Sequence, residues 1–567
     1  MNNWKDALRN VASELGLNSG QNKKNITRSS RLPNVKSAST PPINTKQRKS
    51  TNPPSETHSL ATRMPAIADR YVLTVRPASR NQELNGRRDV KKNAPVPSSG
   101  TGAKPERLGS ASDGPFPEPE MRNYPVGYED CEGIPNQQWQ SLGTSATIGL
   151  PQPGRRSLCT VGLDFGTAFT KACVQVRNSA YVVHWNMCVR SSQPFLLPSM
   201  FSEHQDGKCV LGSHTGARQY SDIKMALLGS PTGLDQTAAV VFIALVTRYV
   251  RAWLFTEHRS VVDGFTLDWS MNVGLPASSW DSPDTASLYK NLSVAGWRLG
   301  AADGPISIAM ATDELASVKS GSSPISGQIK AEMIETFPEF GAQVHSYRSS
   351  SQHQRDLHLL VDVGAGTVDV VNFHIGEEDE SEINCILETH VKKHGTHILL
   401  AYRAQAAGLN GRTWMDATAR MSRAAFEESF SLPPGSLNDV QEHFSDMLHL
   451  SIRQVLHMTK TDRYETSPRW REGVPFFLSG GGRDVDAFRE ALRKTSSDRT
   501  MVELSLPVPE DVVLGSVAHS DFHRLSVAHG LSSLAENLAR TLRRSEVPDL
   551  RRVRGYKTDY TESYIEK

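Results

Sequence analysis

The sequence predicts an α/β protein whose folded part has two lobes and follows a long N-terminal tail. Short strand-like runs alternate with longer helical segments from about residue 155 to residue 545, which is the pattern of an α/β architecture. This stretch is much longer than a typical domain of roughly 100–150 residues, which favours two lobes. The composition, with 38% hydrophobic and 22% charged residues, is typical of a soluble protein.

The strands are expected where short apolar runs end in turn residues. They lie at 157–166, 181–186, 358–364, 367–375 and 474–482. Helical periodicity is clearest at 238–258, 436–460 and 524–544. The most apolar run, at 238–246, is shorter than the roughly 20 residues that cross a bilayer, so it predicts a core helix.

A tail at residues 18–154 is expected to be disordered. Residues 18–107 contain 18 Lys or Arg against 5 Asp or Glu, among Ser, Thr, Asn and Pro. Such a segment cannot bury enough apolar surface to offset its ordering entropy. Ahead of it, residues 1–17 could form a short amphipathic helix, which either docks in a partner's groove or rests on its own domain. Its apolar positions are Trp4, Leu8, Val11 and Leu15.

Several classes of site are disfavoured by composition. The net charge of +2 gives no case for nucleic acid or a membrane as partner of the whole chain, although the basic tail remains a weak candidate for nucleic acid. The six cysteines show no CxxC pair, which fits reduced thiols. Gly395 interrupts His390, His394 and His397, which disfavours a metal site there. The N-terminus lacks a signal-peptide apolar stretch, so we expect a cytoplasmic protein without a membrane partner.

Two turns share one pattern, in which an apolar strand ends in Asp-x-Gly and a threonine follows. The first turn has Asp164, Gly166 and Thr167, and the second has Asp362, Gly364, Ala365, Gly366 and Thr367. Glycine lets the backbone approach a phosphate, exposed N–H groups supply donors, and a nearby carboxylate can hold magnesium through water. Two such turns predict a site that clamps a polyphosphate from both sides.

A third glycine cluster, Gly480, Gly481, Gly482 and Arg483, follows a strand-like run. Bare backbone suits a flat ring, and the Arg483 guanidinium could stack on that ring, so the cluster predicts a nucleoside site. The chain has no GxxxxGK[ST] loop and no strand-associated GxGxxG with its acidic partner. The nucleotide folds that depend on those loops are therefore set aside.

With these motifs in this order, the chain resembles the nucleotide-binding domain of the Hsp70 family, within the actin, sugar kinase and Hsp70 superfamily. Asp164–Thr167 resembles the first phosphate motif, Asp362–Asp369 the second, and Ser479–Arg483 the adenosine motif. The resemblance implies a two-lobed actin-like ATPase fold with ribonuclease H-like lobes. That domain would occupy residues 155–545 and would bind ATP with Mg²⁺.

Three further segments extend the resemblance. The segment around Lys224 resembles the stretch whose lysine reaches the γ-phosphate. Pro338–Tyr347 resembles the first connecting helix, whose glutamate faces the attacking water and is Glu339 here. Proline precedes this glutamate, whereas it follows it in the family, so Glu335 remains an alternative. Arg524–Ser533 is similar to the second connecting helix.

The resemblance implies ATP hydrolysis by water attack. Asp164 and Asp362 would hold hydrated Mg²⁺, and the threonine of each turn would donate its hydroxyl to phosphate oxygens. Lys224 would neutralise charge on the transferred phosphoryl group, and Glu339 would orient the water.

Ala168, Phe169 and Ala365 depart from the family's polar or glycine residues. Fewer donors near the phosphates favour slow hydrolysis, or binding with little turnover.

We expect a stand-alone Hsp70-like ATPase that couples its nucleotide state to a protein partner. The C-terminal tail, residues 546–567, is far too short for the β-sandwich and lid with which Hsp70 chaperones hold peptide. Two alternatives remain open. One is an actin-like protein whose filaments are controlled by nucleotide, and the other is a nucleotide-binding regulator with little turnover.

Overall fold

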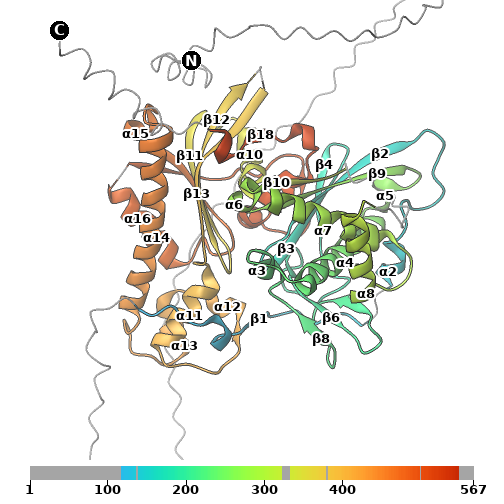
Figure 1. Cartoon of the computed structure of the whole chain (residues 1–567), viewed down its shortest axis with the longest axis horizontal. Coiled ribbons are helices and arrows are strands. Elements are labelled where there is room, and N and C mark those ends of the chain that lie inside the picture. The colour runs from blue at the N-terminus through green and yellow to red at the C-terminus, as the bar shows by residue number, and fades with distance from the viewer. Residues whose placement is uncertain (1–115, 136–137, 322–332, 379–380, 499, 548–567) are drawn as a thin grey trace, which may run out of the picture. The chain divides into compact units, whose positions relative to one another are not determined.

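The structure, a computed structural model, describes residues 116–135, 138–321, 333–378, 381–498 and 500–547. Its main features are two mixed β-sheets with packed helices (Figure 1). We call the first sheet and its helices lobe I and the second sheet and its helices lobe II. The helix predicted at 1–17, the tail up to residue 115 and the C-terminal residues 548–567 lie outside the described residues.

The sheet of lobe I has the order β10-β9-β2-β3-β4-β17, and β5 pairs with β3. Its strands are β2 (Arg156–Asp164), β3 (Phe169–Val176), β4 (Ser179–Val182), β5 (Leu197–Pro198), β9 (Thr266–Leu275), β10 (Ile334–Pro338) and β17 (Val512–Val513). β2, β3 and β4 are antiparallel neighbours, whereas β9 and β10 run parallel to β2. Ranked along the chain, the five main strands therefore lie in the order 3-2-1-4-5.

The sheet of lobe II repeats this arrangement in the order β16-β15-β11-β12-β13-β18. Its strands are β11 (Asp356–Val363), β12 (Val368–Glu378), β13 (Ser381–Lys392), β15 (Val474–Ser479), β16 (Met501–Leu504) and β18 (Arg540–Leu542). The first three are again antiparallel, and β15 and β16 again run parallel to the first. Two such units are the ribonuclease H-like lobes of an actin-like ATPase fold, so the predicted fold is confirmed.

Long helices cover the sheet of lobe I. They are α4 (Gly233–Glu257), α7 (Pro283–Ala301) and α8 (Ile308–Lys319). Thr232 and Asp235 form a capping box that starts α4. Within the described part of the chain, α4 alone is long and apolar enough to cross a membrane, yet its whole apolar window is buried in lobe I. The core helix predicted around 238–246 is thus confirmed.

In lobe II, helices pack on both faces of the sheet. α14 (Asn438–Met458) and α16 (Asp486–Asp498) cover one face, and α6 (Ala277–Asp281), α9 (Glu339–Gln343) and α10 (His345–Arg348) cover the other. The remaining α-helices of the described residues are α2 (Trp139–Leu142), α3 (Ile223–Leu227), α5 (Arg259–Val262), α11 (Thr396–Ala406), α12 (Asp416–Ala419), α13 (Arg423–Ser429), α15 (Arg469–Glu472) and α17 (Ser526–Ser532).

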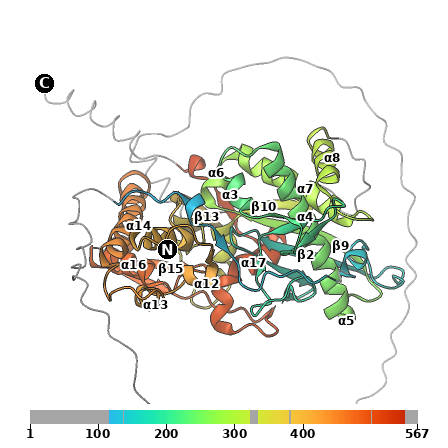
Figure 2. The ribbon, with the colours of Figure 1, turned by 90° about the horizontal axis from the view of Figure 1, so that it is seen from below.

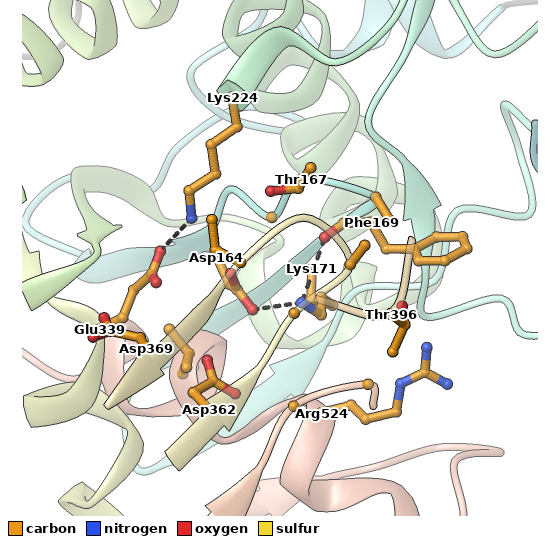
Figure 3. Close-up of a pocket in the computed structure, with 18 of the residues that line it drawn as sticks. Asp164, Thr167, Phe169, Lys171, Lys224, Glu339, Asp362, Asp369, Thr396 and Arg524 are labelled. Carbon is orange, nitrogen blue, oxygen red and sulfur yellow. Dashed lines mark hydrogen bonds and ion pairs between the residues drawn. The ribbon is translucent and has the colours of Figure 1, made fainter. Parts of the chain in front are cut away.

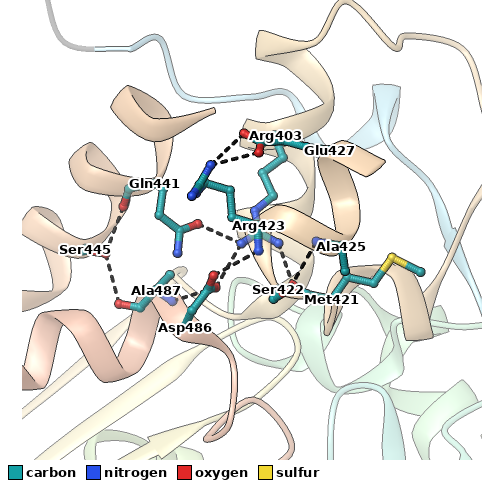
Figure 4. Close-up of polar contacts among 10 residues, drawn as sticks. All are labelled: Arg403, Met421, Ser422, Arg423, Ala425, Glu427, Gln441, Ser445, Asp486 and Ala487. Carbon is teal, nitrogen blue, oxygen red and sulfur yellow. Dashed lines mark hydrogen bonds and ion pairs between the residues drawn. The ribbon is translucent and has the colours of Figure 1, made fainter. Parts of the chain in front are cut away.

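A buried polar network fixes α11 and α13 on α14 and α16 (Figure 4). Arg403 of α11 donates to Met421 O at 2.8 Å, to Gln441 Oε1 at 2.7 Å and to Asp486 Oδ1 at 3.2 Å. The other carboxylate oxygen of Asp486 accepts from the backbone N–H of Arg423 at 2.9 Å. Because one guanidinium joins several helices, these short helices keep a defined position beside the sheet.

Two short helices connect the lobes. α9 leads from β10 of lobe I toward lobe II, and α17 leads from β17 of lobe I to β18 of lobe II. α17 packs across β2 and β3 and against α9, and Figure 2 shows it beside β2. A Cβ added to Gly530 would lie 2.0 Å from the carbonyl oxygen of Ala342, so only glycine permits this crossing. These helices stand where the sequence predicts the two connecting helices.

The folded part starts before residue 155, which is the boundary that the sequence predicts. β1 (Val126–Gly127) pairs with β14 (Trp414–Met415), and the Trp139 ring packs 5.1 Å from that of Tyr249. A three-stranded sheet nearby contains β6 (Phe201–Glu203), β7 (Cys209–Leu211) and β8 (Arg218–Tyr220). Residues 116–154 look like a tail in sequence because their apolar anchors are sparse and their partners are distant in the chain.

Candidate functional site

One cavity lies where the first strands of the two sheets end, and its lining comes from both lobes. Lobe I contributes the turn after β2 and Lys224 of α3, and α9 contributes Glu339. Lobe II contributes the turn after β11, the start of α11 and the turn after β15 (Figure 3). Most of the predicted site residues therefore meet in one place.

Asp164 is the last residue of β2 and is largely buried. Its Oδ2 accepts a hydrogen bond from Lys171 Nζ at 2.7 Å, because Lys171 lies directly opposite on β3. Both side chains line the cavity. Lys171 was not predicted as a site residue, although a lysine inside an otherwise apolar strand could have indicated it.

Lys224 and Glu339 form the second buried ion pair, with 2.7 Å between Nζ and Oε1. Burial raises the pKa of the Glu339 carboxyl although the Lys224 charge opposes this. Burial opposes the charged form of Lys224, but Glu339 and other groups raise its pKa above the ordinary value. The alternative residue, Glu335, is 40% exposed and pairs with Lys290 away from the cavity, so the structure brings Glu339 to the site.

Asp362 and Asp369 face each other across β11 and β12 and both line the cavity. Burial, with the charges of Glu339 and Asp164, raises the pKa of Asp362 to about 6. Burial raises the pKa of Asp369 to about 7, although the Ala277 N–H donates to its Oδ2 at 3.1 Å. The Asp362 Oδ1 is buried and has no hydrogen-bond partner within the described residues.

The lining of the cavity carries charges of both signs. Five carboxylates, two ammonium groups and two guanidinium groups line it, and burial, together with the neighbouring carboxylates, raises the pKa values of Asp362 and Asp369. Within the described ranges no three His, Cys, Asp or Glu side chains are close enough to hold a metal ion directly. The buried Asp362 Oδ1, which has no hydrogen-bond partner among the described residues, and the nearby Asp164 carboxylate fit Mg²⁺ held through water.

The backbone holds each turn open toward the cavity. Ser199 Oγ donates to the carbonyl oxygen of Gly166 at 2.7 Å in the first turn. In the second turn the Thr396 N–H donates to Gly364 O at 3.1 Å, and the His397 N–H donates to Ala365 O at 2.9 Å. Since other parts of the chain occupy these carbonyls, the turns are fixed without any ligand.

The predicted turn residues divide between cavity and packing roles. Those that line the cavity are Gly166, Thr167, Gly364, Ala365 and Thr367. Gly366 does not line it, because it packs against α3 and the other turn: a Cβ added there would lie 2.8 Å from Met225 Sδ and 3.3 Å from Thr167 Cγ2. The two Asp-x-Gly turns of the two lobes thus lie close together.

The third glycine cluster only partly meets its prediction. Gly480 and Gly481 line the cavity. Gly480 has φ +85°, and a Cβ added there would lie 2.4 Å from Asp362 Oδ1, so a side chain does not fit. Gly482 instead packs on Val363. Arg483 lies outside the cavity because the chain turns toward α16 there, and its Nε donates to Asp484 at 3.4 Å.

A different arginine, Arg524, lines the cavity close to Gly481. Burial, with the charge of Arg420, lowers the pKa of Arg524 to about 10. Arg420 pairs with Asp416 at 3.0 Å, and Asp416 also accepts from His397 Nε2 at 2.9 Å. Sequence reasoning missed this group because its members come from separate segments without a motif.

The three histidines considered above as metal ligands, His390, His394 and His397, do not share a site. His394 Nε2 lies 2.9 Å from Phe444 O, and its ring stacks on that of Phe444. His390 Nδ1 lies 3.4 Å from Ser451 Oγ, whereas His397 pairs with Asp416. Each ring therefore has its own separate partner.

No protein-family model matches the chain, and no curated protein matches it. Two solved structures similar to the chain are crystal structures of MreB5 of Spiroplasma citri, one bound to ADP and the other to AMPPNP. Each is 14% identical with a TM-score of 0.36; the first covers 66% of this chain and 94% of that chain, the second 67% and 95%. Values this low assign neither a ligand nor an assembly to this chain.

Proposed function

We propose that the chain is an Hsp70-like ATPase that binds ATP with Mg²⁺ in this cavity and hydrolyses it slowly. One observation carries the proposal: the Asp-x-Gly turns of two lobes face each other across a cavity that also holds the buried pair of Lys224 and Glu339. The exposed backbone of Gly480 and Gly481 adds a third wall that suits a nucleoside.

The residues divide the chemistry among them. Lys171 and Lys224 would offset phosphate charge, and the hydroxyls of Thr167 and Thr367 would donate to phosphate oxygens. Glu339 would orient the attacking water. Asp164 and Asp362 would hold Mg²⁺ through water, and the ion would supply positive charge that offsets the charge of the phosphates. Arg524 takes the place beside the nucleoside that the sequence assigns to Arg483.

Slow turnover follows from the same geometry. The Glu339 carboxylate is bound by Lys224 at 2.7 Å, so it must exchange a strong contact before it can orient water. Ala168 and Phe169 make the first turn less polar, which leaves fewer donors for phosphate oxygens. Both features weaken turnover more than binding.

Binding would be signalled through the connecting helices. Because site residues come from both lobes, a nucleotide favours the arrangement in which the lobes close on it. α9 starts at Glu339 and crosses α17 at Gly530, so closure changes the packing between these helices. A protein partner that reads this crossing would sense the nucleotide state.

The test is ATP binding and hydrolysis by the full chain with Mg²⁺, measured by calorimetry and by phosphate release. We expect Asp362→Ala to lose binding, because it removes a magnesium-holding carboxylate. We expect Glu339→Gln to keep binding but to lose most turnover.

Glu335→Gln is the matched control, since Glu335 lies nearby but pairs with Lys290 outside the cavity. It should behave as the wild type. Absence of ATP binding by the wild-type chain would overturn the proposal. Binding without turnover would support a nucleotide-binding regulator instead of an ATPase.

A further inference from the structure

We propose that residues 120–135 form a strap that holds the two lobes closed over the cavity, and that the Tyr128 side chain secures it by packing beside both turns. The strap runs between β14 and α12 on one side and the lobe I loops on the other (Figure 1). The part of the proposal that concerns nucleotide release rests on the proposed function.

One end of the strap is bound to lobe II. β1 runs parallel to β14, and the Trp414 N–H donates to Pro125 O at 2.8 Å. Tyr124 is buried against α11, and its hydroxyl donates to Asn410 Oδ1 at 2.7 Å. The Glu129 carboxylate accepts from the Ala417 N–H at 3.0 Å at the start of α12. These contacts combine backbone pairing, apolar burial and a charged helix cap.

The other end is bound to lobe I. The Ser213 N–H donates to Cys131 O at 2.8 Å, and the Gly133 N–H donates to Ser213 O at 2.9 Å. The Arg190 N–H donates to Glu132 O at 3.0 Å. A Cβ added to Gly133 would lie 1.9 Å from His214 Nε2, so the strap lies tightly against this loop. Within a few residues the chain thus pairs with both lobes.

Tyr128 lies next to the lobe I attachment and beside the cavity. It is 7% exposed and forms a buried apolar cluster with Ala168 and Met200, against which Phe169 and Ala365 pack. Its ring centroid is 5.5 Å from that of Phe169 and 6.5 Å from that of His397. The cluster around the Tyr128 ring therefore includes residues of both Asp-x-Gly turns.

Opening the cavity at this edge has a definite structural cost. The lobes cannot separate here unless Tyr128 leaves its contacts or one end of the strap unpairs. Closure is thereby favoured before any ligand binds, and release of a bound nucleotide must wait for the strap. We therefore expect the strap to govern dissociation rates more than association rates.

The experiment compares the full-length wild type with Tyr128→Ala and Tyr128→Phe. Hydrogen exchange of the nucleotide-free protein is followed by mass spectrometry in peptides that contain residues 165–169 and 363–367. Release of a fluorescent ADP analogue is followed by stopped flow. We expect Tyr128→Ala to exchange faster at both turns and to release the analogue at least about tenfold faster, whereas Tyr128→Phe keeps the packing and stays near the wild type.

Tyr402→Ala is the matched control, because Tyr402 is 6% exposed and packs near Phe444 in lobe II. It should leave exchange at 165–169 unchanged. Glu129→Ala weakens the strap independently, because it removes the contact with the Ala417 N–H and changes only a half-buried side chain. It should also speed exchange at both turns and release of the analogue, and it remains informative if Tyr128→Ala folds poorly.

Unchanged exchange at both turns in Tyr128→Ala and Glu129→Ala would overturn the strap. Faster exchange in chains that bind no nucleotide would support the strap and overturn the proposed function, so the two failures are distinguishable.

Discussion

The buried carboxyl groups of the cavity are the residues whose energetics the structure defines most sharply. The charges of Glu339, Asp362 and Lys224 act on Asp369, whose Oδ2 accepts from the Ala277 N–H. The negative neighbours and the burial favour the protonated form. These groups therefore make the ligand-free protein sensitive to pH in a range where most surface carboxyls have finished titrating.

The contribution of Asp362 and Asp369 to the stability of the ligand-free protein should fall as the pH rises from about 4 to about 7. The pKa values of Asp362, about 6, and Asp369, about 7, are raised above the ordinary value of 3.8, so the folded chain binds more protons than the unfolded chain across this window. Each group adds a slope of at most about 1.4 kcal/mol per pH unit. Asp369→Asn should flatten this decline in urea unfolding and stabilise the protein at pH 8.

Asp206→Asn serves as the control for that comparison, because Asp206 lies in an exposed turn far from the lining of the cavity. It should follow the wild-type pH profile. If the pH profile of Asp369→Asn is identical to that of the wild type, Asp369 is already ionised between about pH 4 and pH 7.

Some residues of the cavity could be predicted from the sequence, and others could not. Asp164 and Asp362 were predictable because short local patterns identify them, and Lys224 because its segment resembles that of the family. Arg524 and Asp416 were not, since their place in the cavity depends on how distant segments pack. Arg483 was assigned from its neighbours in sequence, but a turn of the chain directs its side chain to Asp484.

Among the elements, α9 and α17 cross with no room for a side chain at Gly530. Gly530→Ala would place a methyl group 2.0 Å from the carbonyl oxygen of Ala342, which requires a backbone shift. We expect a loss of about 2 kcal/mol or more in the free energy of unfolding, measured by urea denaturation. Gly233→Ala is the control: a Cβ there meets nothing within 4 Å, so it should be neutral or slightly stabilising.

The network around Arg403 predicts a second effect on element packing. Arg403→Ala would leave Gln441, Asp486 and the Met421 carbonyl without their shared donor, and we expect a loss of about 2–4 kcal/mol. Arg489→Ala removes an exposed pair with Asp484 and should cost about 1 kcal/mol or less. Equal losses of stability in Arg403→Ala and Arg489→Ala, measured by thermal or urea unfolding, would contradict a structural role for the buried network.

The first strand of each lobe was predictable for a physical reason. β2 and β11 are apolar runs buried on both faces, and that pattern is visible in sequence. The short strand β1 was not predictable, because two residues carry no periodicity and their partner β14 lies far along the chain.

For the whole molecule, a ligand that bridges both lobes should stabilise the folded chain. ATP with Mg²⁺ at 100 times its Kd would add about 2.7 kcal/mol if only the folded state binds it. We expect a corresponding rise in Tm by differential scanning fluorimetry, reduced by EDTA and absent in Asp362→Ala. An unchanged Tm at saturating concentrations would contradict binding in the cavity.

The strap also sets an order of events during synthesis. Glu129 and its partner Ala417 are 288 positions apart, and all of lobe I except β17 and α17 lies between them. Domains tend to fold from the N-terminus as the chain emerges from the ribosome, whereas contacts so distant in sequence form late. A nascent chain would thus carry the strap attached to lobe I alone until β14 and α12 have been made.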